Sequence, residues 1–160
     1  MLVATVLLTY RPDLVGLAQP AADPAPASAA TRQASAYKID AIELFLVPMQ
    51  RVEYKYQLAK GATMLFTWKA DATVYFDMHN VPEGRPITES VRIEDGEATE
   101  AHGVYAAPYP GLHGWYWENR GSDAVLIQLK TAGFYTGALM ISDGEQTPME
   151  LQDPPPPKEP

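Results

Sequence analysis

Apolar and polar side chains alternate with a period of two from about residue 37 to residue 151. Successive side chains of a β-strand point to opposite faces, so this period predicts strands that are buried on one face. VEYKYQLA shows it most clearly, with an apolar face (Val52, Tyr54, Tyr56 and Leu58) and a polar face (Glu53, Lys55 and Gln57). Further strand-like runs are ATMLFTWKA, TVYFDMHN, SVRIE, EATEAHGVYAA, HGWYWEN, AVLIQLKTA and FYTGALMIS.

Turn-forming residues separate these runs at intervals of roughly 8–12 residues. Asp95-Gly96 is the strongest signal for a tight hairpin, and Lys69–Asp71 is expected to break the chain between two strands. No segment has the pattern of an amphipathic helix, although 34–40 could begin one. The spacing predicts an all-β fold over 37–151, a single antiparallel β-sandwich of about eight strands, GOLD-like or jelly-roll-like.

The segments outside this region have a different composition. Residues 1–17 are hydrophobic, but the apolar run 2–8 is shorter than the roughly 20 residues that span a bilayer. We interpret them as a truncated membrane anchor, a weak signal sequence with a cleavage site near 27–29, or a short buried piece. Residues 18–36 form an Ala/Pro-rich linker, and 152–160 form a proline-rich tail.

Aromatic residues concentrate in GLHGWYWENRG, residues 111–121. Trp115 and Trp117 are two positions apart, so on a strand they share a face and Tyr116 takes the other. We expect both tryptophans, with Trp68, to form an aromatic core. His113 and Asn119 are expected to serve the turns that flank the strand. The alternative is an exposed aromatic platform for a carbohydrate or lipid.

Residues 58–141 resemble a family of small bacterial proteins called transmembrane anchor proteins, in LAKGATMLFTWKAD, TVYFDMHN and GVYAAPYPGLHGWYWENRGSDAVLIQLKTAGFY. The turn, aromatic strand and Asn also resemble the late hairpin of GOLD-type sandwiches. The family resemblance implies one N-terminal membrane helix, an Ala-rich linker and a domain of unassigned activity. This chain departs from the family by lacking most of that helix.

Charge and cysteine content exclude several classes of function. The net charge is −8, and all of it falls on residues 37–160, because two arginines balance two aspartates before them. Such a domain repels phosphate backbones, so we expect no nucleic-acid partner. The chain has no cysteine, which excludes disulfides, thiol catalysis and thiolate metal sites.

Three histidines are the candidate metal ligands. His79 and Asp77 lie two apart on one strand, and His102 and His113 lie in later strands. If these four side chains converged, they could hold zinc or copper. The alternative is that each histidine bonds a backbone carbonyl at a strand end or turn. The six acids between positions 83 and 100 are expected to form a solvated face.

Catalysis is not predicted, because the sequence has no nucleophile motif and no phosphate-binding glycine loop. A jelly-roll enzyme would need the three histidines clustered with a carboxylate inside an open barrel. We expect instead a module tethered to the bacterial inner membrane that faces the periplasm and binds a protein partner in the envelope. The alternative function is a small-ligand binder, for a metal through the histidines or a carbohydrate through exposed aromatics.

Overall fold

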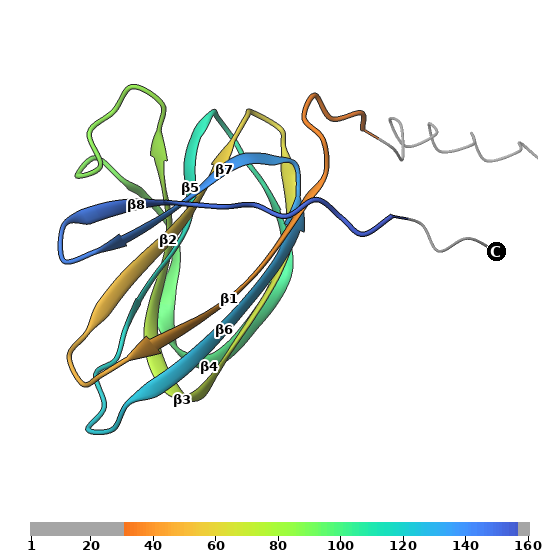
Figure 1. The fold of residues 1–160 in the computed structure, drawn as a ribbon. Coiled ribbons are helices and arrows are strands. Elements are labelled where there is room, and N and C mark those ends of the chain that lie inside the picture. Colours follow the sequence, from red (N-terminus) through yellow and green to blue (C-terminus); the bar gives the residue numbers. More distant parts are fainter. Residues whose placement is uncertain (1–30, 157–160) are drawn as a thin grey trace, which may run out of the picture. The chain divides into compact units, whose positions relative to one another are not determined.

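The computed structural model describes residues 31–156, which form eight antiparallel strands in one curled sheet and no helix (Figure 1). The predicted all-β class is confirmed. The strands are β1 (Lys38–Leu46), β2 (Arg51–Leu58), β3 (Thr63–Pro82), β4 (Val91–Ala106), β5 (Gly111–Glu118), β6 (Val125–Gly133), β7 (Tyr135–Ser142) and β8 (Glu145–Met149). The sheet closes only partly, so its shape is a half-barrel.

The long strand β3 organises the sheet. The strand order is β1-β6-β3-β5-β2-β7-β8, and β4 pairs with β3 alone. The first part of β3 pairs with β6 and the second part with β5, while β4 follows nearly the whole length of β3. The register between β3 and β4 shifts between Lys69 and Val74. Since irregular pairing increases local bending, β3 carries the sheet around the curl at this point.

Three local predictions were wrong. Lys69–Asp71 does not end a strand, because Ala70 pairs with Ile127 and the chain continues through β3. Asp95-Gly96 lies inside β4, where Gly96 pairs with Phe76. The segment 34–40 begins no helix, since β1 starts at Lys38. In each case pairing with a neighbouring strand overrides the local preference.

The tight hairpin forms instead at Asp143–Gly144, between β7 and β8. Both residues have positive φ angles, 52° and 84°. A two-residue turn with positive φ at both positions matches the right-handed twist of antiparallel strands, and Asp-Gly adopts it readily. The same dipeptide therefore makes a turn in ISDGEQ and part of a strand in IEDGEA.

The concave face of the sheet holds the core. Trp68, Trp115 and Trp117 are at most 1% exposed, and the rings of Trp68 and Trp117 meet edge to face with centroids 5.9 Å apart. Tyr116 points to the opposite face and is partly exposed. The two tryptophans of β5 therefore do not form an exposed platform. Their face also carries most of the large apolar side chains of β2 and β6.

A polar network lies inside this core. The Asp40 carboxylate accepts hydrogen bonds from the hydroxyls of Tyr54, at 2.8 Å, and Tyr56, at 3.0 Å. Thr131 donates to Tyr56 at 3.0 Å and shares a hydrogen bond with Tyr135 at 2.9 Å. Burial raises the pKa of all three tyrosines, that of Tyr135 to about 12. The network joins β1, β2, β6 and β7, and its buried groups satisfy one another.

His113 and Asn119 fix the two ends of β5. His113 donates from Nε2 to the Tyr109 carbonyl at 3.0 Å and accepts at Nδ1 from the Tyr105 hydroxyl at 2.8 Å. Asn119 donates to the carbonyls of Leu46, at 2.9 Å, and Asp123, at 2.8 Å, and accepts from the Gly121 amide at 2.9 Å. Both side chains therefore hold the turns beside the tryptophan strand.

The compact unit begins at Gln33. Residues 31–37 have no regular secondary structure, although the Ser35 hydroxyl donates to the Phe134 carbonyl at 3.2 Å. The start of the proline-rich tail pairs with β1, through Ile39 with Gln152 and an ion pair of Lys38 with Asp153. The predicted anchor or signal and most of the linker lie outside the described residues. Within residues 31–156, no helix has the length and apolarity needed to span a membrane.

Candidate functional site

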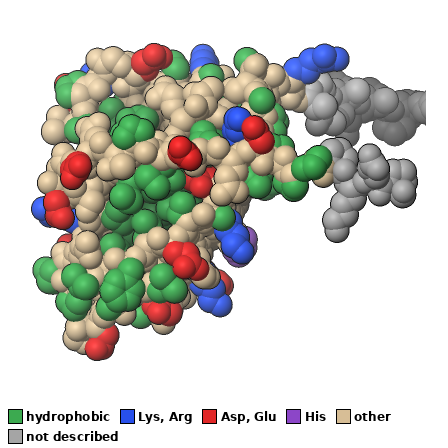
Figure 2. All heavy atoms as spheres, in the orientation of Figure 1, with side chains coloured by type: hydrophobic (Ala, Val, Ile, Leu, Met, Phe, Trp, Pro, Cys, Tyr) green, Lys and Arg blue, Asp and Glu red, His purple; other side chains and the backbone are tan. Residues whose placement is uncertain are grey.

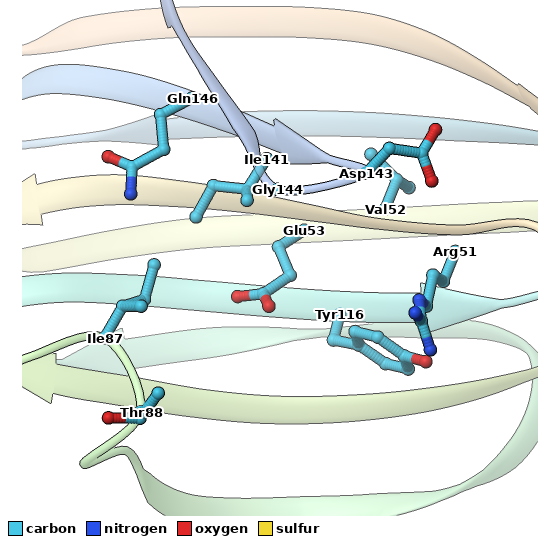
Figure 3. Close-up of a pocket in the computed structure, with 10 residues that line it drawn as sticks. All are labelled: Arg51, Val52, Glu53, Ile87, Thr88, Tyr116, Ile141, Asp143, Gly144 and Gln146. Atoms are coloured by element: carbon cyan, nitrogen blue, oxygen red, sulfur yellow. The ribbon is translucent and has the colours of Figure 1, made fainter.

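A cleft of about 560 Å³ lies on the outer face of the sheet (Figure 3). Its floor is formed by β2 and β5, and its walls by the 83–90 segment on one side and the β7–β8 hairpin on the other. The lining residues are Arg51, Val52, Glu53, Ile87, Thr88, Tyr116, Ile141, Asp143, Gly144 and Gln146. The volume is that of a typical ligand pocket.

Glu53 occupies the floor, and its carboxylate points into the middle of the cleft (Figure 3). The side chain is 24% exposed. Its Oε2 atom is buried without a hydrogen bond, 3.3 Å from His79 Nε2 and 3.5 Å from Lys55 Nζ. Burial favours a raised pKa for Glu53, but its charged surroundings, with the Lys55 ammonium among them, outweigh burial and lower the pKa below its usual value. The cleft therefore contains a fixed negative charge.

Lys55 supplies the positive charge beneath Glu53. Its side chain is 0% exposed, and Nζ lies 2.7 Å from His79 Nε2 and 3.3 Å from the His79 carbonyl oxygen. Burial lowers the pKa of Lys55 to about 8, against the opposing attraction of Glu53. A buried ammonium is costly unless it is paired and hydrogen-bonded. Here Glu53 and His79 satisfy both conditions.

Gly114 allows this arrangement. It lies on β5 between Lys55 on β2 and His79 on β3, in register with both. A Cβ atom at this position would lie 2.2 Å from the Tyr54 carbonyl oxygen. The absence of a side chain lets the Lys55 ammonium reach across β5 to His79. Gly114 stands among aromatic residues in the sequence. A glycine is needed there because the backbones of β5 and β2 approach each other closely.

Asp77 and Arg92 extend the network to the edge of the sheet. Asp77 Oδ1 lies 3.2 Å from His79 Nδ1, and Arg92 Nε donates to Asp77 Oδ2 at 2.8 Å. Because the Lys55 ammonium can only donate to Nε2, the His79 proton lies on Nδ1 and is donated to Asp77. A continuous line of polar groups thus runs from β4 through β3 to Glu53 on β2.

The Asp77–His79 pair has the orientation that positions a catalytic base. The Asp77 carboxylate lies at Nδ1 of His79, and Nε2 faces another partner. That partner is the Lys55 ammonium, which lies beneath Glu53 with its side chain 0% exposed. Glu53 is the group of this network that lines the cleft. The arrangement therefore holds a carboxylate in place, and a ligand that reaches the floor contacts this carboxylate first.

The structure does not bring the four predicted metal ligands together. Asp77 and His79 are adjacent, but His79 is in register with Gly114, so His113 points to the opposite face of the sheet. His102 is exposed on β4 opposite Thr67. Over residues 31–156, no three His, Cys, Asp or Glu side chains form a group that could hold a metal ion such as zinc or copper. Burial lowers the pKa of His113 to about 4, so it is neutral at pH 7.

Sequence reasoning missed the residues that define the cleft. Glu53 and Lys55 fall on the polar face of VEYKYQLA, where charged residues are usually solvated and give no sign of a buried site. Arg92 lies among the six acids that are expected to form a solvated face, and its guanidinium is largely exposed. The signal that could have found the site was the presence of Lys55, His79 and Asp77 on one face of the sheet. Recognising it requires the strand order, which the sequence does not give.

No protein-family model matches the chain, and no curated protein sequence is significantly similar to it.

Proposed function

We propose that this chain is a membrane-tethered, extracytoplasmic interaction module that binds a segment of a protein partner in the Glu53 cleft. One observation carries the proposal. A carboxylate is held by two buried groups in the middle of an open cleft of about 560 Å³, between two projecting chain segments. Binding sites commonly combine a largely preformed cavity with a few fixed polar groups that orient the ligand.

The walls of the cleft suit a projecting side chain of a partner. Ile87 and Ile141 supply apolar contact, and Thr88 and Gln146 supply hydrogen-bonding groups near the rim. Figure 2, in the orientation of Figure 1, shows acidic side chains around a hydrophobic area, in agreement with the net charge of −8. A domain of this charge favours a partner segment of positive charge. Catalysis is not part of the proposal.

The tether rests on the order of segments along the chain. A hydrophobic start, an Ala/Pro-rich linker and an acidic domain are typical of a module held at a membrane. The resemblance to the transmembrane anchor proteins supports the same arrangement, with the domain in the periplasm and the anchor in the inner membrane. From that resemblance we also propose that the half-barrel belongs to the GOLD-like or jelly-roll-like sandwiches. Fractionation of cells that express the full gene tests the tether, which recovery wholly in the cytoplasmic soluble fraction would exclude.

Site-specific photocrosslinking in living cells tests the partner. A photoreactive residue at Thr88 lies in the wall of the cleft, and the same residue at the exposed Thr67 lies on β3 outside it. We expect a discrete protein adduct from position 88 and none of the same mass from position 67. Equal adducts from both positions, or none from position 88, would refute binding of a partner in this cleft.

The cleft volume also favours a second candidate, a binder of small molecules. Cavities of roughly 300–1,000 Å³ hold drug-sized ligands, and this cleft falls within that range. Tyr116 supplies an aromatic surface in its floor. In the first candidate the group that enters the cleft belongs to a protein, and in the second it belongs to a free small molecule. A protein adduct from position 88 favours the first candidate, and its absence favours the second.

A further inference from the structure

We propose that the group bound at Glu53 is an alkylammonium, carried by a lysine side chain of the partner. This inference rests on the proposed function and specifies its ligand chemistry. The anchor is the Glu53 carboxylate in the middle of the cleft (Figure 3). The choice of lysine follows from how that carboxylate is held.

Only one carboxylate oxygen of Glu53 is available to a ligand. The Oε2 atom is buried and faces His79 Nε2 at 3.3 Å and Lys55 Nζ at 3.5 Å. The remaining oxygen, Oε1, faces the cleft. A guanidinium binds a carboxylate best through two parallel hydrogen bonds, which this geometry denies. An ammonium is a compact point charge that binds well to a single oxygen and to further acceptors around it.

Further acceptors line the same cleft. These acceptors are the Tyr116 and Thr88 hydroxyls, the Gln146 side-chain carbonyl and the Asp143 carboxylate, which lie towards the rim of the cleft and not around the Glu53 carboxylate (Figure 3). An ammonium donates three hydrogen bonds, and water at the open mouth can bridge those not made to Glu53 to the acceptors at the rim. The set is unsuited to an anionic ligand, which would meet two carboxylates.

The charge balance also favours a single cation. Among the lining residues, Glu53 and Asp143 oppose Arg51, so two negative charges meet one positive charge. Arg51 lies at one end of the cleft beside Tyr116 (Figure 3). Beneath the floor, Lys55 pairs with Glu53, and Arg92 pairs with both Asp77 and Asp95. The cleft and the groups beneath it together carry four carboxylates against three cationic side chains. One positive charge added to the cleft would neutralise it.

The walls fit the stem of a lysine. Ile141 on β7 and Ile87 in the 83–90 segment lie on opposite sides of Glu53 (Figure 3). The four methylenes of a lysine can pack between these side chains while its ammonium reaches the floor. The 83–90 segment is a loop with exposed polar residues, so the cleft mouth is open to a partner surface.

The test is a titration of the full chain with short peptides, followed by backbone amide NMR shifts. The probe is acetyl-Gly-Lys-Gly-amide, and its matched peptides replace lysine with norleucine, acetyl-lysine or arginine. We expect the lysine peptide to shift the amides of Glu53, Thr88 and Tyr116 with a Kd of about millimolar, as one anchoring side chain provides. The norleucine and acetyl-lysine peptides should bind at least about tenfold more weakly, because they lack the charge.

Variants locate the binding. Glu53→Gln removes the anchor and should weaken the lysine peptide about tenfold, since a charge-assisted hydrogen bond is lost. Asp143→Asn keeps a residue that tolerates the positive φ of this turn and should weaken binding about twofold to fivefold, as for a rim charge. Glu145→Gln is the matched control, because Glu145 lies in the same hairpin outside the cleft, and it should bind like the parent.

Each result decides the inference. Preferential binding of the lysine peptide, lost with Glu53→Gln and kept with Glu145→Gln, supports it. Equal binding of the norleucine peptide, tighter binding of the arginine peptide, or no shift with any peptide overturns it. An adduct from position 88 without peptide binding would leave the proposed function standing and remove only the lysine assignment. Binding of n-butylammonium without any adduct would make the cleft a site for a free amine and refute the partner.

Discussion

The Nζ atom of Lys55 lies 2.7 Å from Nε2 of His79, and the two side chains are 0% and 10% exposed. This contact joins a strand on one side of β5 to a strand on the other. It determines the tautomer of His79 and places a positive charge beneath Glu53. The position and charge state of the Glu53 carboxylate in the cleft depend on it.

Removal of the Lys55 ammonium should therefore be costly. We predict that Lys55→Met lowers the free energy of unfolding by about 3 kcal/mol, because Glu53 Oε2 loses its positive partner while it stays buried. The double variant Lys55→Met with Glu53→Gln should recover much of that loss, since it buries no unpaired charge. Urea denaturation of the two single variants and the double variant measures both effects. Parent-like stability of Lys55→Met would contradict the pairing.

Gly114 should not accept a side chain. A Cβ atom there would lie 2.2 Å from the Tyr54 carbonyl oxygen and 3.1 Å from the Lys55 Cα atom. We predict that Gly114→Ala destabilises the domain by about 3 kcal/mol or more and disturbs the β2–β5 pairing. Gly137→Ala on the neighbouring β7 is the matched control, because its Cβ atom would meet only the Gln57 Cβ atom at 3.8 Å. Equal melting temperatures of the two variants would contradict the close approach of Gly114 to the Tyr54 backbone.

The two faces of β5 should respond differently to truncation. Trp117→Ala should leave a cavity in the core and cost about 3–5 kcal/mol. Tyr116→Ala should cost clearly less, because its ring is partly exposed in the floor of the cleft. It should instead weaken binding of the lysine peptide. Chemical denaturation decides the matter, and a larger loss for Tyr116→Ala would mean that the faces are inverted.

Stability should fall with acidification through the titration of His113. Burial lowers the pKa of His113 from the usual 6.5 to about 4, so between these values the unfolded chain binds more protons than the folded one. The stabilisation is complete above pH 6.5 and is lost as the pH falls towards 4, on the order of 3 kcal/mol in all. Urea denaturation at intervals from pH 7 to pH 4 should show this slope, and His113→Gln should flatten it. An unchanged slope in that variant would exclude His113 as its source.

The amino-acid pattern predicted the fold class and the identity of the core face. Alternation alone placed Trp115 and Trp117 together, because side chains two apart on a strand always share a face. It could not distinguish Asp95-Gly96 from Asp143-Gly144, since the same dipeptide forms a turn only where no long partner strand continues past it. The turn signal at Asp95-Gly96 therefore failed because β4 continues its pairing with β3 through both residues.

The site was largely beyond prediction for a similar reason. Glu53 and Lys55 are separated in sequence from His79 by more than twenty residues, and only the order β3-β5-β2 makes them neighbours. His79 and Asp77 were predicted to bind a metal. In the structure His79 contacts Lys55 and Glu53, and Asp77 contacts Arg92. The sequence of β2 alone does not predict that Lys55 is buried, because its burial depends on Gly114 in the neighbouring strand β5.

The most direct measurement is the yield of the protein adduct formed in cells from a photoreactive residue at position 88, compared between the parent chain and Glu53→Gln at equal expression. If Glu53 anchors a partner in the cleft, the adduct forms with the parent and is largely lost with Glu53→Gln, while Glu145→Gln retains it. Adducts of equal yield in all three proteins would contradict the central claim, because the partner would then bind this face without the carboxylate at its floor.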